Sequence, residues 1–170
     1  MLFRSGYYSV ASKIVEAITG LFVPANNALF PYMSRLFRES RDKYYQLVAK
    51  LNIVYLAAGG FLMAVAMVAG RELVELVNGS FEREVYLLFM VIAVKILIAP
   101  FAPFFTNIWI NQERKQEYLV IVRNTFVANM VVIPPAIYFF GALGMAVVVV
   151  VINFFHLWLF LNRRIRPAGV

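Results

Sequence analysis

The sequence predicts an all-α polytopic membrane protein with about five transmembrane helices. Of its 170 residues, 62% are hydrophobic and only 15% are charged, and the mean hydropathy is +0.76. A soluble domain carries roughly 45–50% apolar and about 25% charged residues, and a chain of this length has too little interior to bury the excess. Uncharged runs at 51–70 and 124–162 reach the length of about 20 residues that a membrane span requires.

Charge and motif content argue against several other classes. Sixteen basic residues against nine acidic ones give a net charge of +7. The basic residues lie in short segments beside apolar runs, however, and not on a soluble face that would bind nucleic acid. Because the chain has no cysteine and one histidine, and no hydrolase or phosphate-loop motif, we expect no enzyme, no metal site and no cofactor. Lys13 and Glu16 interrupt the first apolar stretch, so it does not resemble a signal peptide.

Five segments are the predicted spans of a single domain, 1–170. As one helix, residues 124–162 would be about 58 Å long, nearly twice the hydrocarbon thickness. The chain must therefore reverse within this run, and Gly141-Ala-Leu-Gly144 is the expected turn. The valine run Val147–Val151 is expected to be helical, because an open strand would leave unpaired backbone groups in lipid. The predicted spans are 6–33, 47–70, 85–110, 118–140 and 143–161.

The connecting segments alternate in charge, which predicts an orientation. Nine basic residues fall in the segments 34–46, 111–117 and 162–170, whereas the opposite side carries Arg4, Arg71 and Arg83. Cytoplasmic loops are enriched in lysine and arginine. We therefore expect a multi-pass protein of the inner (cytoplasmic) membrane, with its N-terminus outside and its C-terminus inside.

The first span has two different faces at 100° per residue. The apolar face contains Ala11, Val15, Ile18, Phe22 and Leu29. The opposite arc contains charged, small and helix-breaking residues: Ser9, Lys13, Glu16, Gly20, Pro24, Asn27 and Pro31. Such a stripe is typical of a helix that lines a water-filled cavity. The alternative is that Lys13 and Glu16 only neutralise each other at i, i+3.

Other polar residues lie inside later spans. Lys95 is too deep in the third span to reach the interface easily by snorkelling, whereas Lys50 and Arg123 lie near span ends, where snorkelling is the simpler interpretation. Asn153 and His156 are neighbours on the last span, and an interhelical hydrogen bond is favoured there over a proton relay.

Four sequence motifs stand out along the chain: Gly6–Ile14 (GYYSVASKI), Ala28–Phe37 (ALFPYMSRLF), Thr106–Gln116 (TNIWINQERKQ) and Gly141–Ala146 (GALGMA). These motifs resemble those of the polysaccharide-biosynthesis flippases, the O-antigen (Wzx-type) transporters of the multidrug/oligosaccharidyl-lipid/polysaccharide exporter superfamily. The resemblance extends over nearly the whole chain, although Tyr32 stands where the family would have a basic residue.

The resemblance implies two six-helix lobes around a central cavity that opens alternately to each side. The five spans, ending inside, would then be spans eight to twelve, a C-terminal fragment that forms most of one lobe. The implied cargo is an undecaprenyl-pyrophosphate-linked oligosaccharide, with membrane lipid and either the missing N-terminal helices or another copy of the chain as partners. The candidate cavity-lining residues are Lys13, Glu16, Asn27, Lys95 and Arg123.

Basic residues outnumber Glu16, the one acidic residue within the spans, which favours an anionic cargo over the cations of the multidrug branch. A multidrug-type exporter, a lipid II flippase, a non-transporting remnant and a membrane scaffold remain the alternatives.

Overall fold

The computed structural model describes residues 2–164, and nearly all of this part of the chain is α-helical, with no strand. The predicted all-α class is confirmed. In chain order the helices are α1 (Leu2–Gly20), α2 (Phe22–Glu39), α3 (Arg41–Val68), α4 (Gly70–Asn78), α5 (Arg83–Ala93), α6 (Lys95–Ile98), α7 (Phe101–Asn111) and α8 (Lys115–Arg164).

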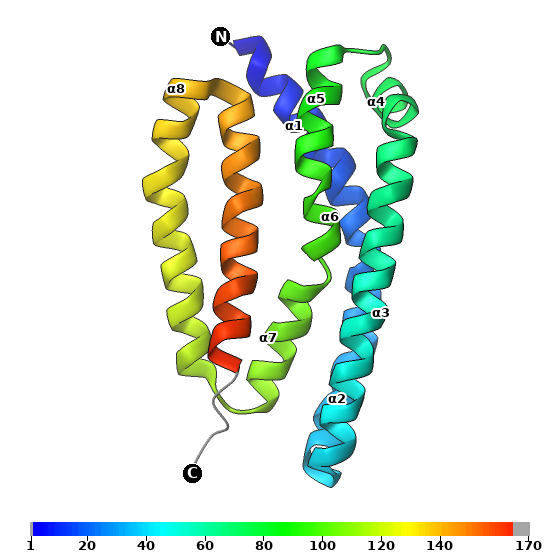
Figure 1. The fold of residues 1–170 in the computed structure, drawn as a ribbon, viewed down its shortest axis with the longest axis vertical. Coiled ribbons are helices and arrows are strands. Elements are labelled where there is room, and N and C mark those ends of the chain that lie inside the picture. The colour runs from blue at the N-terminus through cyan, green and yellow to red at the C-terminus, as the bar shows by residue number, and fades with distance from the viewer. Residues whose placement is uncertain (1, 165–170) are drawn as a thin grey trace.

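The helices combine into long rods that run side by side (Figure 1). α1 continues into α2, α3 forms a rod alone, and α5, α6 and α7 follow one another along a third. α8 contributes two antiparallel legs. Within residues 2–164, three stretches are long and apolar enough to cross a membrane: Arg41–Val68, Arg83–Asn111 and Lys115–Asn162. The chain is therefore an all-α polytopic membrane protein.

The reversal inside α8 occurs at the predicted glycine turn. Gly141 has φ +62° and ψ −142°, which L side chains rarely adopt. Gly144 packs against the preceding leg, where a Cβ would collide with the Ala136 carbonyl oxygen and lie 2.6 Å from Phe140 Cβ. Gly141 is thus needed for its backbone angle, and Gly144 is needed because a side chain would not fit. The chain reverses here as expected, and residues 118–140 and 143–161 lie on two separate legs.

The first rod is broken between α1 and α2, at Leu21. Pro24 explains the position, because proline cannot donate to the carbonyl four residues earlier and its ring collides with that carbonyl, here of Gly20. The two predicted faces of this rod are confirmed. Ala11, Val15 and Phe22 are buried, whereas the whole polar arc is exposed: Ser9, Lys13, Glu16, Gly20, Pro24, Asn27 and Pro31.

Two predicted connecting segments are more helical than expected. α3 begins at Arg41 rather than near residue 47, so the link to α2 is reduced to a corner at Ser40. Its 28 residues extend about 42 Å, beyond a hydrocarbon core of about 30 Å, and the α2–α3 corner projects past the α7–α8 turn (Figure 1). α4 occupies most of the segment between the second and third predicted spans.

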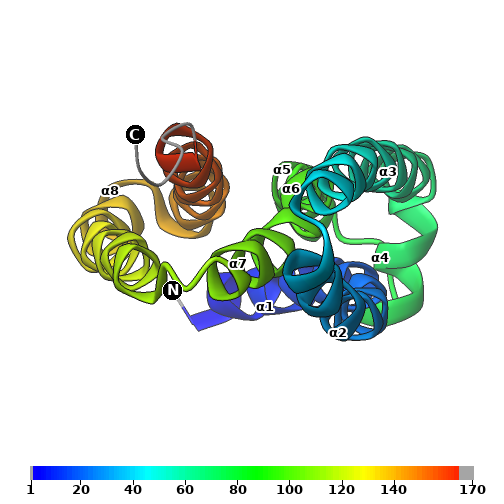
Figure 2. The same ribbon diagram turned by 90° about the horizontal axis from the view of Figure 1, so that it is seen from below.

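The apolar side chains divide between two buried clusters and the outer surface. One cluster joins α1, α4 and α5 and includes single residues of α3, α6 and α8. The other, rich in aromatic rings, joins α2, α3, α7 and α8. Viewed along the rods, α7 and α1 lie between the α8 hairpin and α3 (Figure 2). Large side chains remain exposed on α3 and α8, among them Phe61 at 68% and Tyr138 at 85%. A bilayer would cover this surface.

Candidate functional site

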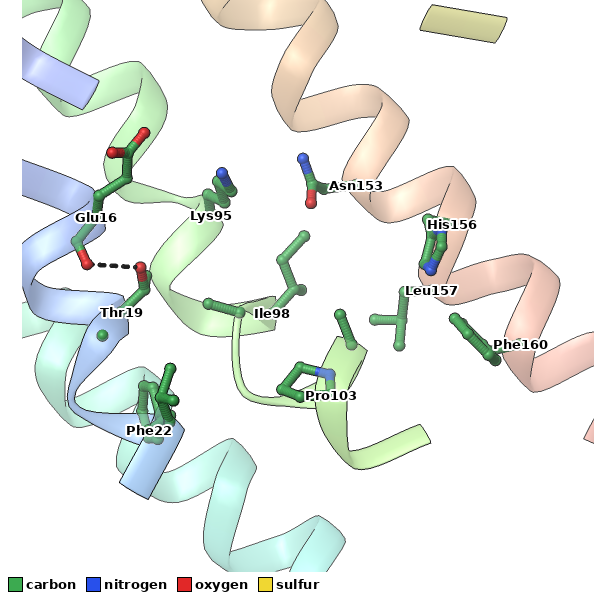
Figure 3. A pocket seen from close by; sticks show the side chains of 14 residues that line it. Glu16, Thr19, Phe22, Lys95, Ile98, Pro103, Asn153, His156, Leu157 and Phe160 are labelled. Carbon is green, nitrogen blue, oxygen red and sulfur yellow. Dashed lines mark hydrogen bonds between the residues drawn. The ribbon is translucent and has the colours of Figure 1, made fainter. Parts of the chain in front are cut away.

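A cavity of about 360 Å³ lies halfway along the third rod (Figure 3). Its wall is built from α1, α2, α6, α7 and the second leg of α8, segments far apart in the sequence. Most of the lining is apolar. The polar members are Glu16, Thr19, Lys95, Asn153 and His156.

Lys95 lies at a point where the third predicted span is not one continuous helix. The helix is interrupted at Val94, where α6 begins with Lys95, and again at Ala99 and Pro100 before α7. Proline has no N–H to donate, so Pro100 and Pro103 leave the carbonyls of Ile96 and Ala99 without their usual helical partners. Broken helices in the middle of a membrane are tolerated where they line a cavity. The half-buried Lys95 thus lies at such a break.

Gly59 of α3 allows its helix to lie directly against the break. A Cβ at Gly59 would stand 2.8 Å from the Leu97 carbonyl oxygen and 3.3 Å from that of Ile96. A Cβ on the neighbouring Gly60 would meet only Leu97 Cδ1, at 3.8 Å. The close approach of α3 to the break is therefore at Gly59 and not at Gly60.

The two charged side chains lie toward one side of the cavity, whereas Thr19 and His156 lie among the apolar side chains. In Figure 3 the Glu16 carboxylate, the Lys95 ammonium and the Asn153 amide lie in a row, and the apolar side chains, including Ile98 and Leu157, lie below this row. Glu16 accepts a hydrogen bond from Ser12 Oγ at 2.8 Å. The cavity therefore presents one group of each charge sign beside an apolar wall.

The structure brings together two of the five residues that the sequence singled out. Glu16 and Lys95 line the cavity. Lys13, Asn27 and Arg123 are exposed and lie outside its lining. Among the described residues, no ion pair joins Lys13 to Glu16, so the intrahelical neutralisation considered for these two residues is not formed.

Sequence reasoning missed Asn26, the neighbour of Asn27. Asn26 is 3% exposed, accepts a hydrogen bond from the Tyr55 hydroxyl at 3.0 Å and donates to the Phe22 carbonyl oxygen at 3.0 Å. The signal was its spacing of four residues from the buried Phe22, which places both on one face of α2. Asn26 therefore ties α2 to α3 close to the cavity.

His156 and Asn153 were expected to hydrogen-bond between helices, and His156 does. Thr125 Oγ1 of the first α8 leg lies 2.9 Å from His156 Nδ1 and 2.9 Å from the Ile121 carbonyl oxygen. A hydroxyl has one hydrogen; if Thr125 gives it to Ile121, the imidazole donates from Nδ1 and Nε2 is left as an acceptor. Asn153 instead donates to the Val149 carbonyl oxygen of its own helix, at 2.7 Å.

Replacing Thr125 by valine should loosen the α8 hairpin modestly. The change removes an interhelical hydrogen bond, which within membranes averages about 0.6 kcal/mol and reaches about 1.7 kcal/mol. Thermal unfolding in detergent micelles measures the loss. Thr106→Val is the matched control, because the Thr106 hydroxyl donates within its own helix, to Ala102 at 2.9 Å. Equal melting temperatures for the two variants would contradict the prediction.

The fold and cavity define a class, the polytopic α-helical membrane proteins with charged side chains in an open cavity part-way along an apolar stretch. Among the described residues, no three histidine, aspartate or glutamate side chains gather as metal ligands. Comparison with family models, with curated proteins and with solved structures gave no match to this chain.

Proposed function

We propose that this chain is the cargo-binding part of a flippase for a lipid-linked oligosaccharide with an anionic diphosphate head. The observation that carries the proposal is Lys95, a cation held in a cavity at a double helix break inside a membrane span. Ionisable residues within membranes are rare because they are costly, and they mark substrate pathways. Discontinuous helices at mid-membrane form the binding sites of many transporters.

The division of the cavity supports an amphipathic cargo. The row of Glu16, Lys95 and Asn153 suits a charged and hydroxylated head, and the apolar wall below suits the start of a prenyl chain. A volume of about 360 Å³ lies near the lower end of the range of ligand pockets, roughly 300–1,000 Å³. The site would thus hold the diphosphate end of the cargo rather than the whole oligosaccharide.

The proposal includes a location, the inner membrane, and an orientation. The corner at Ser40 and the turn at 112–114 lie at the same end of the molecule (Figure 1). Both carry basic residues: Arg35, Arg38, Arg41 and Lys43 in one and Arg114 and Lys115 in the other. The positive-inside rule favours placing this end in the cytoplasm. The motif resemblance agrees with that orientation.

Binding of undecaprenyl pyrophosphate to the chain in lipid nanodiscs tests the function. We expect this probe to bind more tightly than uncharged undecaprenol, because its diphosphate pairs with Lys95. Lys95→Ala should weaken diphosphate binding by about 10- to 150-fold, the equivalent of roughly 1.5–3 kcal/mol for a hydrogen bond to a charged group. Binding of undecaprenol should be unchanged.

Lys50→Ala is the control, because Lys50 is exposed on α3 and lies outside the cavity. Normal diphosphate binding by Lys95→Ala would contradict the proposal. Glu16 is the one feature of the site that favours a cation exporter instead. Binding of tetraphenylphosphonium that depends on Glu16 and not on Lys95 would support that second function.

A further inference from the structure

The outward face of α1 and α2 is an unpartnered polar surface, which we call the α1–α2 stripe. All of its members are exposed: Ser9, Lys13, Glu16, Gly20, Pro24, Asn27 and Pro31. Within the described residues, nothing beyond its own neighbours in the helix approaches a Cβ built on Gly20 to within 4 Å. The stripe therefore runs along the rod as an open face with little side-chain bulk at its centre.

The charged part of this stripe lies at the depth of the membrane interior. Ala11, Ile14 and Val15 on the other face of α1 pack in one buried cluster with Ile92 and Ile96. These last two residues lie near the middle of the apolar stretch Arg83–Asn111. Glu16 lines the same cavity as Lys95, which also lies near the middle of that stretch, and Lys13 is about one turn away on α1, so both charges lie at a depth where exposure to lipid is unfavourable.

Neither charge is neutralised within the described part of the chain. The ion pairs found there join Arg35 to Glu39 and Arg114 to Glu117. Glu16 has the Ser12 hydroxyl as a hydrogen-bond donor, at 2.8 Å; Lys95 borders the same cavity, but no ion pair joins the two among the described residues. The stripe thus offers one positive and one negative group, about one helical turn apart, and each requires a partner of opposite sign.

We propose that a second copy of this chain packs its own α1–α2 stripe against this one, in a parallel two-fold dimer. A two-fold axis along the membrane normal makes the contact reciprocal. Lys13 of each copy meets Glu16 of the other, and two intermolecular ion pairs form. The offset of three residues is about 4.5 Å along the axis, which two long side chains span. The small residues of the stripe allow the backbones to approach closely.

A second copy fits this surface because it matches both charges at once. Lipid chains provide no charge at this depth, and anionic headgroups would match Lys13 alone. Glu16 also belongs to the cavity wall, so the second copy would cover the cavity where α1 borders it. The dimer does not depend on the identity of the cargo, so it can be tested apart from the proposed function.

Charge reversal tests the dimer in liposomes at low protein-to-lipid ratio. The chain has no cysteine, so Ser80→Cys carries a fluorophore, and energy transfer or stepwise photobleaching counts copies. We expect the otherwise unaltered chain to be dimeric. Lys13→Glu and Glu16→Lys should each reduce dimerisation at least tenfold, because like charges then face each other. The double reversal should restore it, and a mixture of the two single variants should form hetero-dimers.

Lys50→Glu is the matched control and should dimerise normally, because Lys50 is exposed on α3, away from the stripe. If the unaltered chain were monomeric, the proposal would be overturned, and the α1–α2 stripe would instead bind another polypeptide segment or the cargo. The proposal would also be overturned if either single reversal dimerised as well as the unaltered chain. It would likewise be overturned if the double reversal dimerised no better than the single reversals. Should the reversed variants fail to fold, Lys13→Met and Glu16→Gln test the same pairs, and unchanged dimerisation would again overturn it.

Discussion

Gly59→Ala should destabilise the protein strongly, whereas Gly60→Ala should be tolerated. The added methyl group at residue 59 would lie 2.8 Å from the Leu97 carbonyl oxygen, a distance that real Cβ atoms essentially never show. The obstacle is backbone, which cannot rotate away, so α3 and α6 must separate. Overpacking of this kind costs typically about 1–3 kcal/mol. At Gly60 the nearest atom is the flexible Leu97 Cδ1 at 3.8 Å, an ordinary contact.

The melting temperature of the detergent-solubilised chain measures this difference. Because α6 carries Lys95, Gly59→Ala should also weaken binding of undecaprenyl pyrophosphate, even at temperatures where the variant remains folded. Gly60→Ala serves as the control of identical chemistry on the adjacent residue. Equal stability of the two variants would mean that the helix break does not depend on close contact with α3.

Cysteine labelling should show an all-or-none difference between the two ends of the molecule. Ser80 is exposed in the loop between α4 and α5, and Ser40 lies at the α2–α3 corner at the opposite end (Figure 1). Because the basic residues gather at the Ser40 end, that end should stay in the cytoplasm. In intact cells, an impermeant maleimide should label Ser80→Cys and not Ser40→Cys.

Gln112→Cys, in the α7–α8 turn at the same end as Ser40, should be protected in the same way. Permeabilising the membrane should make all three positions reactive, which shows that protection came from the bilayer and not from burial. Labelling of Ser40→Cys in intact cells would reverse the proposed orientation. Labelling at both ends would indicate a mixed topology.

The membrane class, the helical hairpin and the faces of the first rod could all be derived from the residues alone, because each depends on local chemistry. An uncharged run too long for one crossing must reverse, and glycine at 141 and 144 marks the place. The 100° periodicity separated Ala11 and Val15 from Lys13 and Glu16, since it depends only on helix geometry.

The position of helix breaks was only partly accessible from the sequence. Pro24, Pro100 and Pro103 predict local distortion of their helices. The interruption at Val94, however, lies before both prolines of the rod formed by α5, α6 and α7. Close packing of Gly59 on the carbonyl of Leu97 accompanies the break, and that contact joins two different helices. Likewise, the periodicity places Asn26 on the face of Phe22, but its hydrogen bond with Tyr55 joins α2 to α3, and no pattern within one helix specifies that partner.

The sequence by itself thus determined the class of the protein and the set of charged residues that the membrane interior must accommodate. Only the tertiary structure decided which of these charged residues line the same cavity. Glu16 and Lys95 share a cavity with His156, while Lys13 and Arg123 do not border it. The physical reason is that periodicity assigns each side chain to a face of its own helix, whereas a cavity depends on how several helices pack, which in turn follows from contacts between residues distant in the chain.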